Sequence, residues 1–243
     1  MKLIKLSAID STNLFLKNLA ENTLLENSTV VMAENQTAGR GQMHTVWKSE
    51  PGKNLTFSVF ERLDQLSVAE QRYLNYAAAL SVWECLEELG VANVQIKWPN
   101  DIMAGHAKIC GLLVENTLKG TDVVATVIGI GLNVNQSFKE ITSFKATSLV
   151  DVLEQEFPLE MVLRTWYTSF EKYMAYLNNR DYDLLESRYL KVLYKKNVPS
   201  MFKTAENELF LGKIVGVSTA GKLRVELADE THRDFGIKEI SFA

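Results

Sequence analysis

The chain has 243 residues, 47% of them hydrophobic and 23% charged, so it is long enough to bury one large core and a smaller one beside it. A net charge of −4 argues against binding to long nucleic acids, which requires a basic surface. The longest uncharged stretch, residues 123–138, is too short and too polar to cross a membrane. Charged residues interrupt the first ten positions too early for a secretory signal, and the two cysteines fit a reducing compartment. We therefore expect a cytoplasmic protein.

The first half of the chain alternates between strand and helix patterns. We expect a strand at residues 3–6, a helix capped by a hydroxyl or carboxylate of residues 10–13, a strand at 30–33, a long loop through 36–44 and a strand at 54–60. Residues 68–89 place apolar side chains every three or four positions and are followed by Gly90. That spacing predicts the longest helix of the chain.

The second half predicts a sheet continued by helices and then a β-rich tail. Strands are expected at residues 94–98, 109–115 and 123–130, helices at 159–177 and 183–193, and short strands at 201–203, 209–217 and 223–227. We therefore predict an α+β fold with a mixed β-sheet flanked by helices at residues 1–194. A small C-terminal β-barrel would follow at residues 195–243.

Residues 39–41, Gly-Arg-Gly, combine open backbone amides with a cation between them. This arrangement suits a phosphate or a carboxylate, because small residues let an anion approach the amides. The sequence does not continue as a dinucleotide-binding or Walker motif. On this segment alone, a flexible surface loop fits equally well.

Residues 97–101, Lys-Trp-Pro-Asn-Asp, follow a strand that stops at the proline. Asn100 and Asp101 thus lie at a strand end, where sheet enzymes often gather ligands, although such a pair by itself is more typical of a turn. Lys108 begins a strand that is otherwise apolar, so its ammonium is placed to neutralise an anion. The alternative is an edge-strand lysine that discourages aggregation.

Two further segments, one glycine-rich and one polar, each fit either a ligand site or a purely structural role. Gly129 and Gly131 interrupt a β-branched run, which indicates either close approach of a ligand or backbone, or a bulge. Residues 11–13, Ser-Thr-Asn, suit a small polar head group, but a helix cap needs the same residues. The histidines at 44, 106 and 232 have no metal-ligand spacing, so we assign no metal site to side chains.

Taken in chain order, these segments resemble the catalytic domain of biotin–protein ligases. The matching segments are residues 10–13, 36–41 with Trp47, 97–101, 108–115 and 129–133. The resemblance spans about residues 1–180 and implies the class II synthetase-like sheet of that family. The tail resembles its small SH3-like C-terminal domain.

The resemblance implies an enzyme that uses ATP, Mg²⁺ and biotin. Biotin would attack the α-phosphate to give biotinyl-5'-AMP, and a lysine of a biotin carboxyl carrier protein, or of the carrier domain of a biotin-dependent carboxylase, would then take the biotin. Mg²⁺ would travel with ATP. Carried over residue by residue, the family pattern assigns catalysis to Lys108 and Arg40, biotin binding to Ser11, Thr12, Asn13, Gln36, Gly39, Arg40, Lys108, Gly111 and Gly129, and nucleotide binding to Arg40, Gly41, Trp47, Asn100, Asp101 and Asn133.

The sequence departs from the family pattern in two places. Gln42, Met43 and His44 stand where relatives often carry two arginines and a glycine, which predicts looser retention of the adenylate. The chain begins at the catalytic domain without a winged helix, which predicts a ligase that binds no DNA. A homodimer and a monomer are both compatible with the pattern.

Two other functions remain compatible with these residues. Lipoate–protein ligases and octanoyltransferases share the fold, but their loop differs from residues 36–47. A non-catalytic biotin- or adenylate-binding module is the other alternative. Lys108 argues against that module, because simple binding has less need of a cation between a carboxylate and a phosphate.

Overall fold

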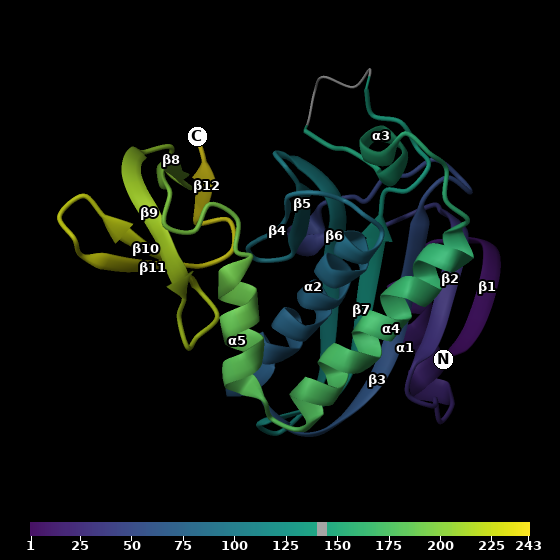
Figure 1. The fold of residues 1–243 in the computed structure, drawn as a ribbon. Helices are drawn as coiled ribbons and strands as arrows, with labels where there is room; N and C mark the ends of the chain where they lie inside the picture. The colour runs from purple at the N-terminus through teal and green to yellow at the C-terminus, as the bar shows by residue number, and fades with distance from the viewer. Residues whose placement is uncertain (140–144) are drawn as a thin grey trace.

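A seven-stranded mixed sheet forms the larger part of this computed structural model, which describes residues 1–139 and 145–243 (Figure 1). The strand order is β1-β2-β3-β7-β6-β5-β4. β1 and β2 are parallel, and every other neighbouring pair in this sheet is antiparallel. The strands are β1 Lys2–Ile9, β2 Thr29–Gln36, β3 Leu55–Ser67, β4 Val94–Lys97, β5 Asp101–Ala104, β6 Ala107–Lys119 and β7 Asp122–Leu132.

Helices cover both faces of this sheet because its central strands alternate buried side chains between them. Val30 and Ile128 belong to the core under α2 and α4, whereas their neighbours Val31 and Val127 pack with Leu16 of α1 on the other face. The helices are α1 Thr12–Asn22, α2 Gln71–Glu88, α3 Leu149–Leu153, α4 Leu159–Asn178 and α5 Tyr182–Lys191, with short 3-10 turns at Gln42–His44 and Val68–Glu70.

A five-stranded antiparallel sheet follows α5 and forms a separate lobe beside the larger sheet (Figure 1). Its strand order is β11-β10-β9-β8-β12. We call it the C-terminal module; its strands are β8 Pro199–Thr204, β9 Leu209–Val217, β10 Leu223–Leu227, β11 His232–Phe235 and β12 Ile240–Phe242. Its buried residues, including Phe202 and Val225, are continuous with the larger core.

Two side chains of the larger sheet and its helices hydrogen-bond the C-terminal module at one turn. Trp98 Nε1 donates to Gly221 O at 3.1 Å, and Arg72 Nη1 donates to Thr219 O at 2.9 Å. Both acceptors are backbone carbonyls of the β9–β10 connection. The module therefore docks directly against the segment that joins β4 to β5.

The predicted α+β fold with a mixed sheet and a β-rich C-terminal part is confirmed, with corrections to individual elements. The sequence did not predict β5, α3, β11 or β12. Residues 68–89 begin as a 3-10 turn with a capping box between Ser67 and Glu70 before α2 starts. α1 does begin after Ser11, but the Ser11 side chain makes no capping hydrogen bond.

In the part of the chain that the structure describes, no helix is both long and apolar enough to cross a membrane.

Candidate functional site

The main cavity of the molecule, about 570 Å³, lies between the larger sheet and the C-terminal module. Residues from both bodies line it: Ser11, Thr12, Asn13, Gln36, Arg40, Gly41, Trp47, Lys97, Asn100, Asp101, Lys108, Gly111 and Gly129 come from the first body, and Phe202, Leu223, Ile237, Lys238, Ile240, Ser241 and Phe242 from the second. A volume of this size accommodates a small organic ligand.

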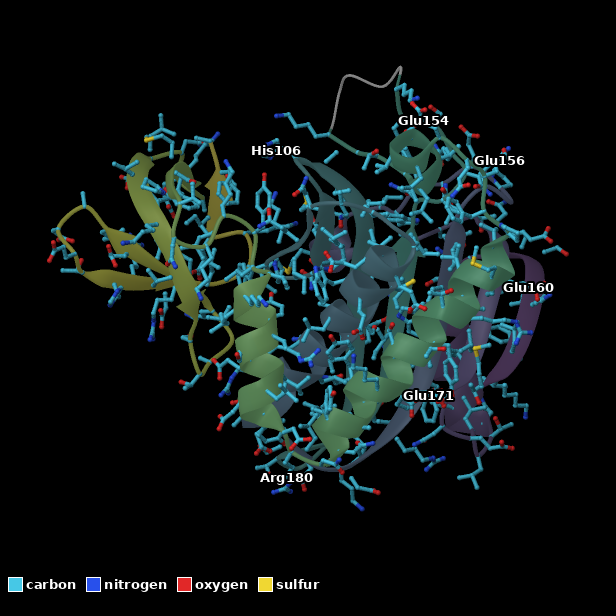
Figure 2. The ribbon with its side chains drawn as sticks, in the orientation of Figure 1. His106, Glu154, Glu156, Glu160, Glu171 and Arg180 are labelled. Carbon is cyan, nitrogen blue, oxygen red and sulfur yellow. The ribbon has the colours of Figure 1, made fainter. Side chains whose placement is uncertain are left out.

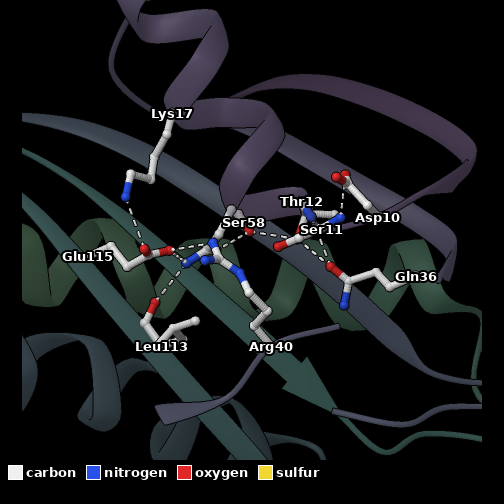
Figure 3. Close-up of polar contacts among 10 residues, drawn as sticks. Asp10, Ser11, Thr12, Lys17, Gln36, Arg40, Ser58, Leu113 and Glu115 are labelled. Carbon is white, nitrogen blue, oxygen red and sulfur yellow. Dashed lines mark hydrogen bonds and ion pairs between the residues drawn. The ribbon is translucent and has the colours of Figure 1, made fainter. Parts of the chain in front are cut away.

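A polar network lies beside the cavity, where α1 meets β2 and β3, and Thr12, Asn13 and Gln36 of this network line the cavity (Figure 3). Gln36 Oε1 accepts hydrogen bonds from Thr12 N at 2.9 Å and from Thr12 Oγ1 at 3.1 Å. The Ser58 hydroxyl lies 2.7 Å from Thr12 Oγ1 and also contacts Asn13 Oδ1. The Thr12 and Ser58 hydroxyls, the Asn13 amide and the Gln36 amide oxygen each have a partner, so the network presents an ordered polar surface.

Glu115 connects this network to the glycine loop, residues 39–47 (Figure 3). Its carboxylate accepts from Asn13 Nδ2 at 2.8 Å, from Lys17 Nζ at 3.0 Å and from Arg40 Nη2 at 3.3 Å. Burial by itself would raise the pKa of Glu115, but the hydrogen bonds from Asn13 and Lys17 and the charges of Lys17 and Arg40 lower it overall. Glu115 is therefore a stable anion, and Arg40 is held by it.

The glycines of β7 make room for two side chains of the site. A Cβ on Gly129 would lie 2.3 Å from Asn13 Oδ1, and a Cβ on Gly131 would lie 2.4 Å from Trp47 Cε2. Both positions pair regularly with β6 and β3, so no bulge interrupts the strand there. The sequence suggested approach of a ligand or a backbone or a bulge, whereas in the structure the groups that approach these glycines are the Asn13 and Trp47 side chains.

Lys108 and Asp101 form an ion pair across β5 and β6, with Lys108 Nζ 2.6 Å from Asp101 Oδ1. The lysine side chain crosses Gly111, where a Cβ would meet its Nζ at 3.1 Å, and its ammonium lies 5.6 Å from the centre of the Trp47 ring. β6 is an interior strand between β7 and β5, so the alternative of an edge-strand lysine is wrong. The neighbouring Asn100 amide donates to the Leu112 carbonyl.

The glycine loop folds back on itself as a small hairpin. Gly41 N donates to Thr45 O at 2.7 Å, and Trp47 N donates to Gly39 O at 3.0 Å. A Cβ on Gly39 would lie 2.5 Å from Trp47 O, and a Cβ on Gly41 would lie 2.4 Å from Thr45 Oγ1. Gly39 is thus required for the close contact with the Trp47 backbone, and Gly41 leaves room for the Thr45 hydroxyl.

Two of the residues assigned from the sequence lie outside the cavity lining. Gly39 packs against the Trp47 backbone instead, on the side where a Cβ would meet the Trp47 carbonyl. Asn133, just after the end of β7, is buried, and its Nδ2 donates to Thr147 O at 2.9 Å. In this structure Asn133 holds the chain between β7 and α3, and its nucleotide role stays a prediction.

The sequence did not point to Ser58, Glu115 or the residues of the C-terminal module as members of the site. Ser58 comes opposite Gly129 only through the pairing of β3 with β7. Glu115 carries one available signal: it is a lone acid at the end of the apolar run that follows Lys108. The lining residues of β12 could not be recognised, because that three-residue strand was not predicted.

Within residues 1–139 and 145–243, no three histidine, cysteine or acidic side chains gather as a metal site. His106, in the turn between β5 and β6, lies 3.2 Å from the Tyr194 hydroxyl through its Nδ1 (Figure 2). Cys85 and Cys110 are buried and unbonded to each other, and burial raises the pKa of the Cys85 thiol to about 12. Neither thiol is activated as a nucleophile.

These features define an α+β protein whose cavity combines a hydroxyl and amide network, a lysine–carboxylate pair and a glycine loop with an arginine. The model of the Biotin/lipoate A/B protein ligase family matches residues 6–133, and the chain belongs to this family. The resemblance drawn from the sequence is confirmed, and with it the prediction that the chain is a ligase.

Individual relatives agree with this assignment. The chain is 32% identical over 245 aligned residues to the bifunctional ligase/repressor BirA of Bacillus subtilis, covering 98% of this chain and 71% of that protein. It is 34% identical over 145 residues to a biotin–[acetyl-CoA-carboxylase] ligase of Mycobacterium tuberculosis, covering 58% of this chain and 52% of that protein. A solved biotin protein ligase from Aquifex aeolicus, in complex with biotin and ATP, superposes with a TM-score of 0.79 at 25% identity, covering 100% and 98% of the two chains.

Proposed function

We propose that this chain activates biotin with ATP as biotinyl-5'-AMP and transfers the biotin to a lysine of a biotin carboxyl carrier protein or domain. The observation that carries the proposal is the Lys108–Asp101 pair at 2.6 Å, set in the same cavity as the Thr12–Gln36 network. Biotin has a neutral polar ring and a carboxylate that must approach the α-phosphate of ATP. A cavity with a neutral polar network and a cation suits such a substrate.

The two ends of the cavity suit the two ends of that substrate. The ordered amides and hydroxyls of Thr12, Asn13 and Gln36 would hold the ureido ring of biotin, which both donates and accepts hydrogen bonds. Lys108 and Trp47 lie farther along the cavity, beside Gly111. The carboxylate of biotin would reach this second region.

The first chemical step joins two anions, so its barrier depends on positioning and on charge neutralisation. A biotin carboxylate oxygen would attack the α-phosphorus, and pyrophosphate would leave with the bonding electrons of the broken P–O bond. Lys108, now held by Asp101, would turn its ammonium toward both anions.

The second step needs no covalent bond to the protein. A carrier lysine, as the free amine, would attack the acyl carbon of the mixed anhydride. AMP would leave with the electrons of the broken acyl C–O bond, and the amide nitrogen would lose its extra proton to water. Mg²⁺ would enter with the nucleotide, because Asp101 is the lone carboxylate among the described residues that line the cavity, and it is already paired. Mg²⁺ would contribute by neutralising the phosphates of ATP.

The test is pyrophosphate release by the purified chain with ATP and Mg²⁺, comparing biotin with lipoate and octanoate. We expect release with biotin, followed by labelling of an added biotin carrier domain but not of the same domain with its acceptor lysine changed to arginine. Release with lipoate or octanoate and none with biotin would move the assignment to the lipoate branch of the family. Tight biotin binding without pyrophosphate release would favour the non-catalytic module.

A further inference from the structure

Lys238 of the C-terminal module reaches the tip of the glycine loop. Its Nζ donates a hydrogen bond to Met43 O at 2.8 Å, across 195 positions of sequence, and Lys238 also lines the main cavity. Ile237 and Gln42, the neighbours of these two residues, together line a smaller side cavity. The module and the tip of the loop, residues 42–45, therefore contact each other through Lys238 and Met43, beside a cavity that both help to line.

The loop tip has few other attachments. Among the residues that the structure describes, the backbone hydrogen bonds of Gln42 and Thr45 stay within the loop, and Met43 is 55% exposed. Met43 also has a left-handed backbone, with φ +50°, which is unfavourable for a side chain of its type. A bond from a fixed body outside the loop would hold the tip in this conformation.

Lys238 is attached to such a body. It lies in the turn between β11 and β12, which Glu239 closes by accepting from Gly236 N at 2.6 Å. The module itself is docked through Trp98 and Gly221 at 3.1 Å. The ammonium of Lys238 thus reaches the loop from a turn that the Gly236–Glu239 hydrogen bond stabilises.

Its pairing differs from that of Arg40 and Lys108, and Lys97, which also lines the cavity, lies 5.5 Å from the centre of the Phe242 ring. Arg40 is paired with Glu115 and Lys108 with Asp101, whereas Lys238 forms no ion pair within residues 1–139 and 145–243 and donates to a neutral carbonyl. Residues 42–45 of the loop tip contain no lysine or arginine. Lys238 therefore supplies the tip with a positive charge that the loop tip itself lacks.

We propose that Lys238 is a positioning residue that ties the glycine loop to the C-terminal module and so slows escape of the acyl-adenylate. This inference rests on the proposed function. The loop carries Arg40 and Trp47, both of which line the cavity, so the anchored tip keeps both residues over a bound ligand. The C-terminal module thereby takes part in product retention.

The first arm of the test needs no ligand. Trypsin cleavage after Arg40 and Lys48, followed by mass spectrometry, would compare the wild type with Lys238→Met, Lys238→Arg and Lys222→Met. Lys222→Met removes an exposed lysine of the same module that does not line the cavity. We expect roughly three- to tenfold faster cleavage in Lys238→Met, the effect of one partly exposed charge-assisted hydrogen bond, and rates near wild type in Lys238→Arg and the control. Unchanged cleavage in Lys238→Met would refute the tether.

The second arm measures dissociation of preformed biotinyl-5'-AMP from the same four proteins. Lys238→Met should release it roughly three- to tenfold faster, and Lys238→Arg should restore slow release. Faster loop cleavage with unchanged release would overturn the retention role. Failure of the wild type to form any adenylate would refute the proposed function instead, while the cleavage arm would still decide whether the tether exists.

Discussion

Gly129 offers the sharpest perturbation of the polar network, because a single methyl group there collides with one residue. In Gly129→Ala the new Cβ would lie 2.3 Å from Asn13 Oδ1, 2.9 Å from its Cγ and 3.2 Å from its Nδ2. Contacts below 3 Å force a displacement. Asn13 is 3% exposed and its amide is bonded at both ends, so rotation in place cannot relieve the collision.

Displacing Asn13 breaks three interactions. Its Nδ2 donates to the Glu115 carboxylate at 2.8 Å and to Leu113 O at 3.2 Å, and its Oδ1 contacts the Ser58 hydroxyl. A neutral hydrogen bond contributes about 0.5–1.5 kcal/mol, and one to a charged group about 1.5–3 kcal/mol. These bonds hold the Asn13 amide in place, and biotin loses its own contact with that amide when Asn13 moves. A binding loss of about 2 kcal/mol, roughly one hydrogen bond with its desolvation cost, corresponds to roughly a 30-fold weaker apparent affinity for biotin.

The assay is biotin-dependent pyrophosphate release with separate titrations of biotin and ATP. We expect the KM for biotin to rise about 30-fold and the KM for ATP to change little, because the network lies at the biotin end. Gly216→Ala is the matched control: it also lies in a strand, and its new Cβ would meet nothing closer than Leu190 Cδ2 at 3.8 Å. An unchanged KM for biotin in Gly129→Ala would mean that Asn13 does not contribute to biotin binding.

A double variant separates the collision from direct obstruction of the ligand. If the methyl group acts by displacing Asn13, then Asn13→Ala combined with Gly129→Ala should be no worse than Asn13→Ala alone. If the methyl group itself blocks biotin, the double variant should be clearly worse. That second outcome would mean that the structural role given to Asn13 is wrong.

Three further substitutions test the roles of Lys108, Arg40 and Glu61. Lys108→Ala should slow adenylate formation at least about 100-fold, which is the usual effect of losing charge stabilisation at a reacting group. The melting temperature should change little, because the Lys108–Asp101 pair is partly exposed. An undiminished rate would remove Lys108 from the mechanism. Arg40→Ala should speed release of the adenylate several-fold in a dissociation assay, and unchanged release would contradict a phosphate role for the loop. Burial raises the pKa of Glu61 above its ordinary 4.5 despite hydrogen bonds from Ser28, so the ionised carboxylate opposes folding as the pH rises through the folded pKa. Glu61→Gln should therefore melt at a higher temperature than the wild type at pH 7, and calorimetry should find the difference gone below about pH 4; a pH-independent difference would contradict this.

The sequence predicted the long elements because their apolar spacing is regular over many residues. α4 matches the predicted helix at residues 159–177 almost residue for residue, and the β6–β7 hairpin turns at the predicted Gly120. β5 was missed because it follows Pro99 and Asn100 at once and has only four residues, so that turn chemistry dominated the pattern. β11 and β12 were too short for an alternating pattern to be visible.

The candidate site was predictable where chemistry is concentrated in a short segment. Arg40 with its glycines, and Lys108 in an apolar strand, are recognisable from neighbours in sequence. Glu115 could not be assigned, because its role depends on Asn13 and Arg40, which only the register of the sheet and the loop bring to it. The same holds for Lys238, whose contact with Met43 joins opposite ends of the chain.

Formation of the acyl-adenylate is tested by mixing one equivalent of the purified chain with biotin, ATP and Mg²⁺ and identifying the nucleotide that stays bound. We expect biotinyl-5'-AMP by mass spectrometry, with one equivalent of pyrophosphate in solution. Recovery of unchanged ATP and unchanged biotin from the protein would contradict this expectation.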